Sequence, residues 1–82
     1  MNSQANSAFA ATLRKLRNER GMSQYTLARV TDLDRTYISL LERGLRSPSL
    51  DTMLALARGL NVSLVAIAAA VEATLLAGPP NA

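Results

Sequence analysis

The chain has 82 residues, which is enough for one small domain and leaves no room for a second. Its composition is 49% apolar and 18% charged, which is typical of a folded domain rather than a disordered tail. It contains no cysteine and no histidine, so disulfides and zinc sites built on these residues are excluded, and the commonest groups that activate a nucleophile are absent. We therefore expect no enzyme activity, no metal and no cofactor.

The net charge of +3 comes from nine basic and six acidic residues and suits an anionic partner. The first ten residues have no basic stretch followed by an apolar one, so neither a signal peptide nor a transit sequence is predicted. Residues 62–77 are mostly apolar, but Ser63, Glu72 and Thr74 interrupt them and the stretch is shorter than the roughly 20 residues of a membrane span. We expect a cytoplasmic protein that does not bind a membrane.

An all-α fold of five short helices is predicted, because the apolar residues recur at helical spacing and strand signals are missing. The folded domain is expected to span residues 9–77. Residues 1–8 are small and polar, so we expect a flexible tail there, and residues 78–82 should form a second tail after a Gly-Pro-Pro stop.

Residues typical of helix ends divide this domain. Serine and aspartate cap helix starts, and glycine and asparagine end helices because they tolerate positive φ. Boundary residues of this kind are Gly21, Ser23, Asp34, Gly44, Asn61 and Ser63. The second helix is thus expected at about residues 24–31 and the fifth at about 64–77. The inward faces of the first and fourth helices are predicted to carry Phe9, Leu13, Leu16, Leu50, Met53, Leu54, Ala57 and Leu60.

The most informative stretch is SQYTLARVTDLDRTYISLLERG, residues 23–44. Two helices joined by about three residues must cross steeply, which requires a small residue at the close approach, and Ala28 meets this requirement. The turn needs a residue that tolerates positive φ, and Asp32 occupies that place. Four apolar residues are predicted to face inward: Leu27, Leu33, Ile38 and Leu41. Together these features indicate a helix-turn-helix at about residues 24–43.

Four stretches carry a family resemblance: LRKLRNERGMSQ, the Gln24-x-x-x-Ala28 helix, LDRTYISLLERG and RSPSLDTMLALARGLNVSL. Over roughly residues 9–67 the chain resembles the lambda-repressor-like DNA-binding domains of the Xre or Cro/C1 type. Within that family it is most similar to the controller proteins of restriction–modification systems. It departs from the family pattern at Thr26 and Asp32, and at Leu40, where phage repressors often carry a polar base-reading side chain.

The third helix offers hydrogen-bonding side chains near its amino end, which reaches deepest into the major groove in a helix-turn-helix. Arg35 is placed for bidentate bonds to a guanine, a contact worth about 1–3 kcal/mol of discrimination. Thr36 can bond a phosphate or touch a thymine methyl, and Ser39 lies on the same stretch. We predict base reading by these three residues; the alternative for Arg35 is a solvated surface charge.

Contacts to the DNA backbone are predicted around this helix. Gln24 can bring its amide and nearby backbone N–H groups to a phosphate, as the matching position does in the resembling family. Tyr37 is expected to contact a phosphate or sugar, or otherwise to pack on the first helix. Arg43 and Arg46 flank the following loop and are expected at the backbone. Arg46 could instead enter the minor groove, and both could be ordinary loop charges.

The resemblance also implies a structural ion pair between Arg17 and Glu42, which would tie the first helix to the end of the third. The remaining basic residues are expected to be solvated surface charges: Arg14, Lys15, Arg20, Arg29 and Arg58.

The fifth helix is more apolar than a single buried stripe requires. One stripe is predicted to close the domain: Leu64, Ala68, Val71 and Leu75. A second stripe is predicted to form a dimer interface: Val65, Ala69 and Leu76. The alternative is that the alanines only favour helix formation. A symmetric dimer would present two recognition helices to half-sites about 34 Å apart on an inverted repeat.

The sequence therefore predicts a homodimeric, sequence-specific transcriptional regulator that binds double-stranded DNA through the major groove. Controller-like behaviour would include regulation of its own gene, with RNA polymerase as a candidate partner. No small-molecule effector is expected. An alternative of a different class stays open: an antitoxin-like helical module whose last helix binds a partner protein, with DNA binding secondary.

Overall fold

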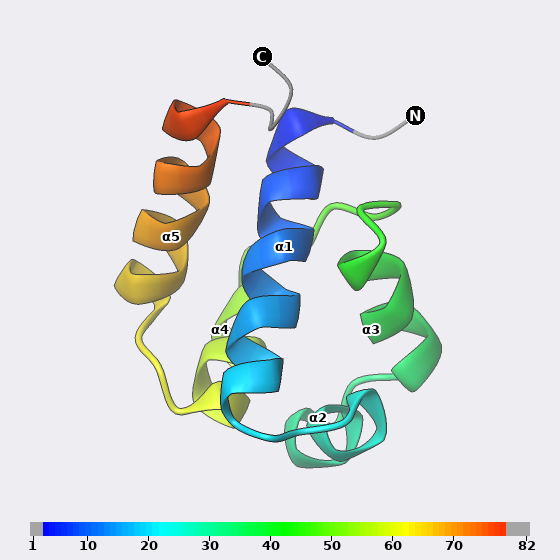
Figure 1. The fold of residues 1–82 in the computed structure, drawn as a ribbon. Helices are drawn as coiled ribbons and strands as arrows, with labels where there is room; N and C mark the ends of the chain where they lie inside the picture. Colours follow the sequence, from blue (N-terminus) through cyan, green and yellow to red (C-terminus); the bar gives the residue numbers. More distant parts are fainter. Residues whose placement is uncertain (1–2, 79–82) are drawn as a thin grey trace.

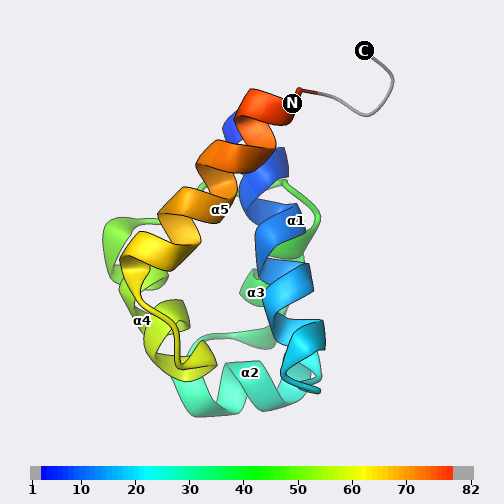
Figure 2. The ribbon, with the colours of Figure 1, turned by 60° about the vertical axis from the view of Figure 1, so that its left-hand side comes forward.

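The computed structural model describes residues 3–78, which form five helices around one core (Figure 1). In chain order these are α1 (Gln4–Glu19), α2 (Gln24–Thr31), α3 (Arg35–Glu42), α4 (Leu50–Leu60) and α5 (Leu64–Ala77). Helix α1 packs against both α3 and α5, while α2 packs against α3 and α4. Figure 2 shows α2 crossing one end of the bundle, below α1 and α4. The all-α fold predicted from the sequence is confirmed.

Four of the five helices begin at a serine. The hydroxyls of Ser3, Ser23, Ser49 and Ser63 each accept a hydrogen bond from the backbone N–H three residues later, and Asp34 caps α3 in a similar way. Each cap satisfies a backbone donor that the first turn of a helix leaves without an intrahelical partner. The predicted starts of α2, α3 and α5 are confirmed.

Helices α2 and α4 end at residues in the left-handed conformation, Asp32 with φ 60° and Asn61 with φ 57°. Aspartate and asparagine enter this region more readily than other residues with a side chain, so the chain reverses here without a glycine. Gly21 and Gly44 take positive φ after α1 and α3. These helix ends are the ones that the sequence predicts.

Helix α1 begins at Gln4, earlier than the sequence predicts. The expectation of a flexible tail over residues 1–8 is therefore wrong for residues 4–8. Ser3 caps the helix, Ala8 is buried, and α1 lies along α5. A small, polar composition suggested disorder, but alanine favours helices and a neighbouring helix supplies the packing. Residues 1–2, and residues 79–82 of the predicted second tail, lie outside the described part of the chain.

The core draws large side chains from α1, α2, α3 and α4. Those that are fully buried are Leu13, Leu27, Ile38, Leu41, Leu56 and Leu60. The inward face of α4 differs in part from the predicted one, because Leu50 and Leu54 are exposed whereas Leu56 is buried. Two overlapping stripes on α4 have helical spacing, and only the position of the neighbouring helices selects between them.

The inward face of α5 also differs from the predicted one. Ile67, which belongs to neither predicted stripe, is its buried residue. Leu64 and Val71 are half-buried as expected for the closing stripe, but Ala68 and Leu75 are exposed. Apolar residues are spread around the whole circumference of the helix, so their periodicity does not indicate which side faces the core.

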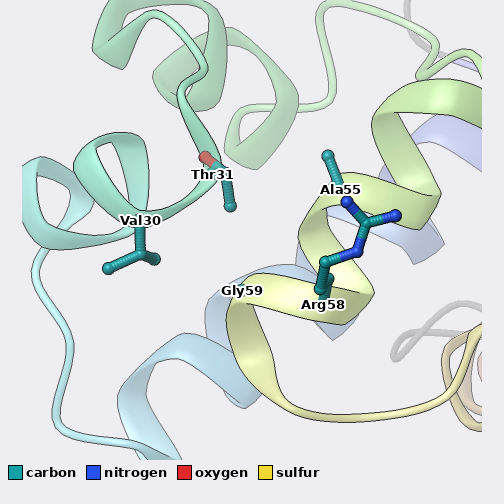
Figure 3. A pocket seen from close by; sticks show the side chains of 5 residues that line it. All are labelled: Val30, Thr31, Ala55, Arg58 and Gly59. Carbon is teal, nitrogen blue, oxygen red and sulfur yellow. The ribbon is translucent and has the colours of Figure 1, made fainter.

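Helices α2 and α4 approach each other closely at Gly59. A Cβ atom at this glycine would lie 2.5 Å from Cγ2 of Thr31, whose hydroxyl donates to the carbonyl of Leu27 at 2.7 Å. Beside this contact lies a pocket of about 220 Å³ (Figure 3), lined by Val30, Thr31, Ala55, Arg58 and Gly59.

The chain turns by 107° between α4 and α5. Within residues 3–78, no single helix has the length and apolar character needed to cross a membrane. Only α4 and α5 taken together have that length and apolar character, and the pair is bent.

Candidate nucleic-acid interface

Helices α2 and α3 form a helix-turn-helix around the left-handed Asp32. Ala28 is 9% exposed, and its carbonyl accepts the backbone N–H of Leu33 at 3.2 Å, which closes the turn. Leu27 and Ile38 are fully buried on the inner side of the pair. The inward face predicted for this motif is therefore confirmed, and its outer side is available for a ligand.

The first turn of α3 projects into solvent. Arg35 and Thr36 are exposed, and Ser39, one turn after Arg35, is half-buried. Residues four apart lie on the same face of a helix, so Arg35 and Ser39 point to the same side. Leu40, the departure from the family pattern, is half-buried. Arg35 and Thr36 thus lie in the first turn of α3, and Ser39 lies one turn later on the side of Arg35.

Tyr37 and Arg46 lie against each other. The guanidinium carbon of Arg46 is 5.7 Å from the centroid of the Tyr37 ring, within the range of a cation–π contact. The Tyr37 hydroxyl lies 3.2 Å from the Thr52 hydroxyl on α4. Sequence reasoning named both residues for the DNA backbone but predicted neither this pairing nor the contact with Thr52. The arrangement joins the loop after α3 to the recognition helix.

Glu42, at the end of α3, is 3% exposed and accepts three hydrogen bonds on its carboxylate. Arg17 donates to it from Nε at 2.6 Å and from Nη2 at 2.9 Å, and Gln24 donates from Nε2 at 3.0 Å. The ion pair expected between Arg17 and Glu42 is present. The hydrogen bond to Glu42 raises the pKa of Arg17 above its usual value. This carboxylate therefore holds together α1, the start of α2 and the end of α3.

Two arginines expected to be solvated surface charges are exposed, and each also donates to a backbone carbonyl. Arg14 bonds the carbonyl of Glu42 at the end of α3, and Arg20 bonds that of Leu60 at the end of α4. The last carbonyls of a helix have no intrahelical donor, so a guanidinium is a suitable partner. The spacing of Arg14 and Arg17 indicates the contact between Arg14 and Glu42, because residues three apart share a helix face and Arg17 also bonds Glu42. Arg43, the predicted backbone ligand that follows α3, is exposed.

Comparison with known proteins connects this geometry to a family. A family model described as helix-turn-helix matches residues 13–67. The chain is 42% identical to the control protein C.SmaI of Serratia marcescens over 56 residues, which cover 68% of this chain and 67% of that protein. It is also 42% identical to the control protein C.MunI of a Mycoplasma species over 57 residues, which cover 68% and 77%.

A solved structure of similar fold is the restriction–modification controller protein C.Esp1396I, as a tetramer in complex with its natural 35 base-pair operator. The two chains align with a TM-score of 0.84 and 35% identity, over 92% of this chain and 99% of the other. The chain therefore belongs to the helix-turn-helix family of the Xre or Cro/C1 type and, within it, to the controller proteins of restriction–modification systems.

Proposed function

We propose that the protein is a sequence-specific transcriptional regulator that binds an inverted-repeat operator as a dimer, with α3 in the major groove. The observation that carries this proposal is the exposed amino end of α3, where Arg35 and Thr36 project from a helix-turn-helix in a chain of the controller family. The related C.Esp1396I is known in complex with its operator, which supports the same class of ligand for this chain.

Base reading is assigned to Arg35, Thr36 and Ser39. Asp34 accepts the backbone N–H of Thr36 at 2.7 Å, so the start of α3 is fixed before DNA arrives. Arg35 can then present two parallel donors to O6 and N7 of a guanine, while the two hydroxyls suit a base edge or a thymine methyl. Leu40 supplies only an apolar contact at its position.

Backbone contacts are assigned to Gln24, Tyr37, Arg43 and Arg46. The Gln24 amide uses one donor on Glu42, and a primary amide has a second N–H that can bond a phosphate. The ring of Tyr37 carries Arg46 on one side, so the two side chains reach the backbone as a unit. Side chains that are already oriented lose less conformational entropy when they bind.

The dimer interface is assigned to the outward stripe of α5. Val65 is 77% exposed and Leu76 is 84% exposed, and Ala69 lies between them on the same side. Large apolar side chains that are this exposed form a stripe on the helix, and a second subunit can cover it. A two-fold axis through α5 would place two copies of α3 on half-sites roughly 34 Å apart.

In its regulatory role the protein acts in the cytoplasm on its own gene and a neighbouring one, activating or repressing transcription according to operator position. RNA polymerase is the second macromolecule with which it would work. The antitoxin-like alternative finds no support among the relatives described above. Nor does the assigned role need an enzymatic step, since Arg35 and its neighbours recognise DNA without changing it.

The test compares two arginine variants on an operator obtained by in vitro selection of bound duplexes. Arg35→Ala should reduce the preference for specific over random DNA by about 1–3 kcal/mol per half-site, because a bidentate guanine contact is lost. Arg43→Ala should weaken both and reduce the slope of log affinity against log salt by about one per bound subunit. The measurement is fluorescence anisotropy of labelled duplexes, with footprinting for half-site spacing. An unchanged specificity ratio in Arg35→Ala would overturn the assignment of α3.

A further inference from the structure

The structure gathers cationic groups around the end of the recognition helix. Arg14, Arg17 and Gln24 all donate to Glu42, the first to its backbone carbonyl and the other two to its carboxylate. We call these four residues the Glu42 cluster. Arg43 follows directly in the chain. The two guanidinium groups of the Glu42 cluster outnumber its one carboxylate, so the cluster carries a net positive charge beside the predicted phosphate ligand Gln24.

The two arginines of the Glu42 cluster differ in their surroundings. The side chain of Arg17 is 14% exposed, and its Nε and both terminal nitrogens donate to protein acceptors, two of them to Glu42 and Nη1 to the Met22 carbonyl at 2.8 Å. Arg14 is exposed, and it donates to Glu42 from Nη1. A guanidinium carries five N–H donors in a planar fork, so Arg14 keeps donors directed toward solvent while one terminal nitrogen is anchored.

We propose that Arg14 binds a DNA phosphate at the same edge of the interface as Gln24, while its anchored nitrogen holds the end of α3. This inference rests on the proposed DNA binding and adds a contact from α1, an element to which no DNA role was assigned. The bond to Glu42 fixes the position of the Arg14 guanidinium near Gln24, because both residues are bonded to Glu42. Phosphates prefer such planar, multiply donating cations.

The alternative is that Arg14 is only a structural cap for the last carbonyl of α3. Two substitutions separate the roles. Arg14→Gln removes the charge but keeps an N–H donor, whereas Arg14→Lys keeps the charge. The matched control is Arg58→Gln, which removes the same charge from an exposed position on α4 beside the pocket between α2 and α4 (Figure 3).

Each variant is titrated with selected operator and with random duplex between about 50 and 200 mM salt, a range over which phosphate contacts dominate the salt dependence. We expect Arg14→Gln to weaken both duplexes equally and to lower the magnitude of the salt slope by about one per bound subunit. Arg14→Lys and Arg58→Gln should keep the wild-type slope. A wild-type slope in Arg14→Gln, or an equal loss of slope in Arg14→Lys, would overturn the proposal.

A measurement on the wild-type chain covers the case in which Arg14→Gln does not fold, as judged by circular dichroism. The Nε–H resonance of Arg14 in an ¹⁵N spectrum should shift when operator DNA is added, while that of Arg58 stays in place. An Arg14 resonance that does not move at saturation would count against the contact. The proposed function is tested independently of the Arg14 contact. It fails if the wild-type chain shows no preference for any selected duplex.

Discussion

At the scale of single residues, Glu42 connects three helices. Its buried carboxylate accepts hydrogen bonds from α1 and from the start of α2, and its own carbonyl accepts one from Arg14. The resemblance to a known family implied the pair with Arg17, but the additional donors follow only from how three helix ends meet. A charge this deeply buried is tolerated because every partner is in place.

Glu42→Ala should destabilise the fold by about 3–5 kcal/mol, because the largely buried Arg17 loses the carboxylate that compensates its charge. For a domain of this size we expect the melting temperature to fall by at least about 12 °C. Thermal and urea unfolding followed by circular dichroism measure the change. Glu19→Ala, an exposed acid on α1, is the control and should shift stability by less than about 0.5 kcal/mol. Equal stabilities of the two variants would contradict this reading of the pair.

At the scale of elements, the sequence located the helices well and their contacts less well. Capping residues depend on local hydrogen bonds, so the caps of α2, α3 and α5 are readable from the chain. The side that a helix turns inward depends on its neighbours, which is why Leu56 on α4 and Ile67 on α5 were missed. The approach of α4 to α2 at Gly59 is of the same kind, since it joins residues far apart in sequence.

Gly59→Ala should destabilise the domain by about 1–3 kcal/mol, although alanine is the better helix former, because its Cβ would overlap Cγ2 of Thr31. The Thr31 side chain cannot turn away without giving up its bond to the Leu27 carbonyl. In a Thr31→Ser background that methyl is absent and the hydroxyl remains. There the same substitution should stabilise by about 0.5–1 kcal/mol. Urea unfolding of the wild type, the two single variants and the double variant measures these changes in stability. If Gly59→Ala changes stability in the same direction in both backgrounds, the clash is ruled out.

At the scale of the whole molecule, the basic residues are confined to one part of the chain. All nine basic residues lie between Arg14 and Arg58, whereas residues 59–82 contain one acid and no base. Helices α3 and α5 lie on opposite sides of α1 (Figure 1). The net charge of +3 is thus an average over a basic part that carries the proposed DNA interface and a neutral, apolar helix that carries the proposed dimer interface.

Leu76→Glu and Val65→Glu should each convert a dimer to a monomer, because a charge would be buried without a partner in the interface. Light scattering at micromolar to millimolar concentration reports the mass, and circular dichroism reports whether the monomer keeps its helices. Asn18→Glu, at an exposed position of α1, is the control and should leave the mass unchanged. A wild-type chain that is monomeric throughout this range would refute the α5 interface.

The sequence by itself determined the helix ends from α2 onward, the helix-turn-helix and the exposed donors Arg35 and Thr36, because these depend on residues close together in the chain. Only the tertiary structure decided that α1 begins at Gln4, that Ile67 is the inward residue of α5, and that Arg14 is bonded to the end of α3. Each of these outcomes depends on which helices become neighbours. Local composition was ambiguous there, and long-range packing selected one arrangement from several that the pattern allowed.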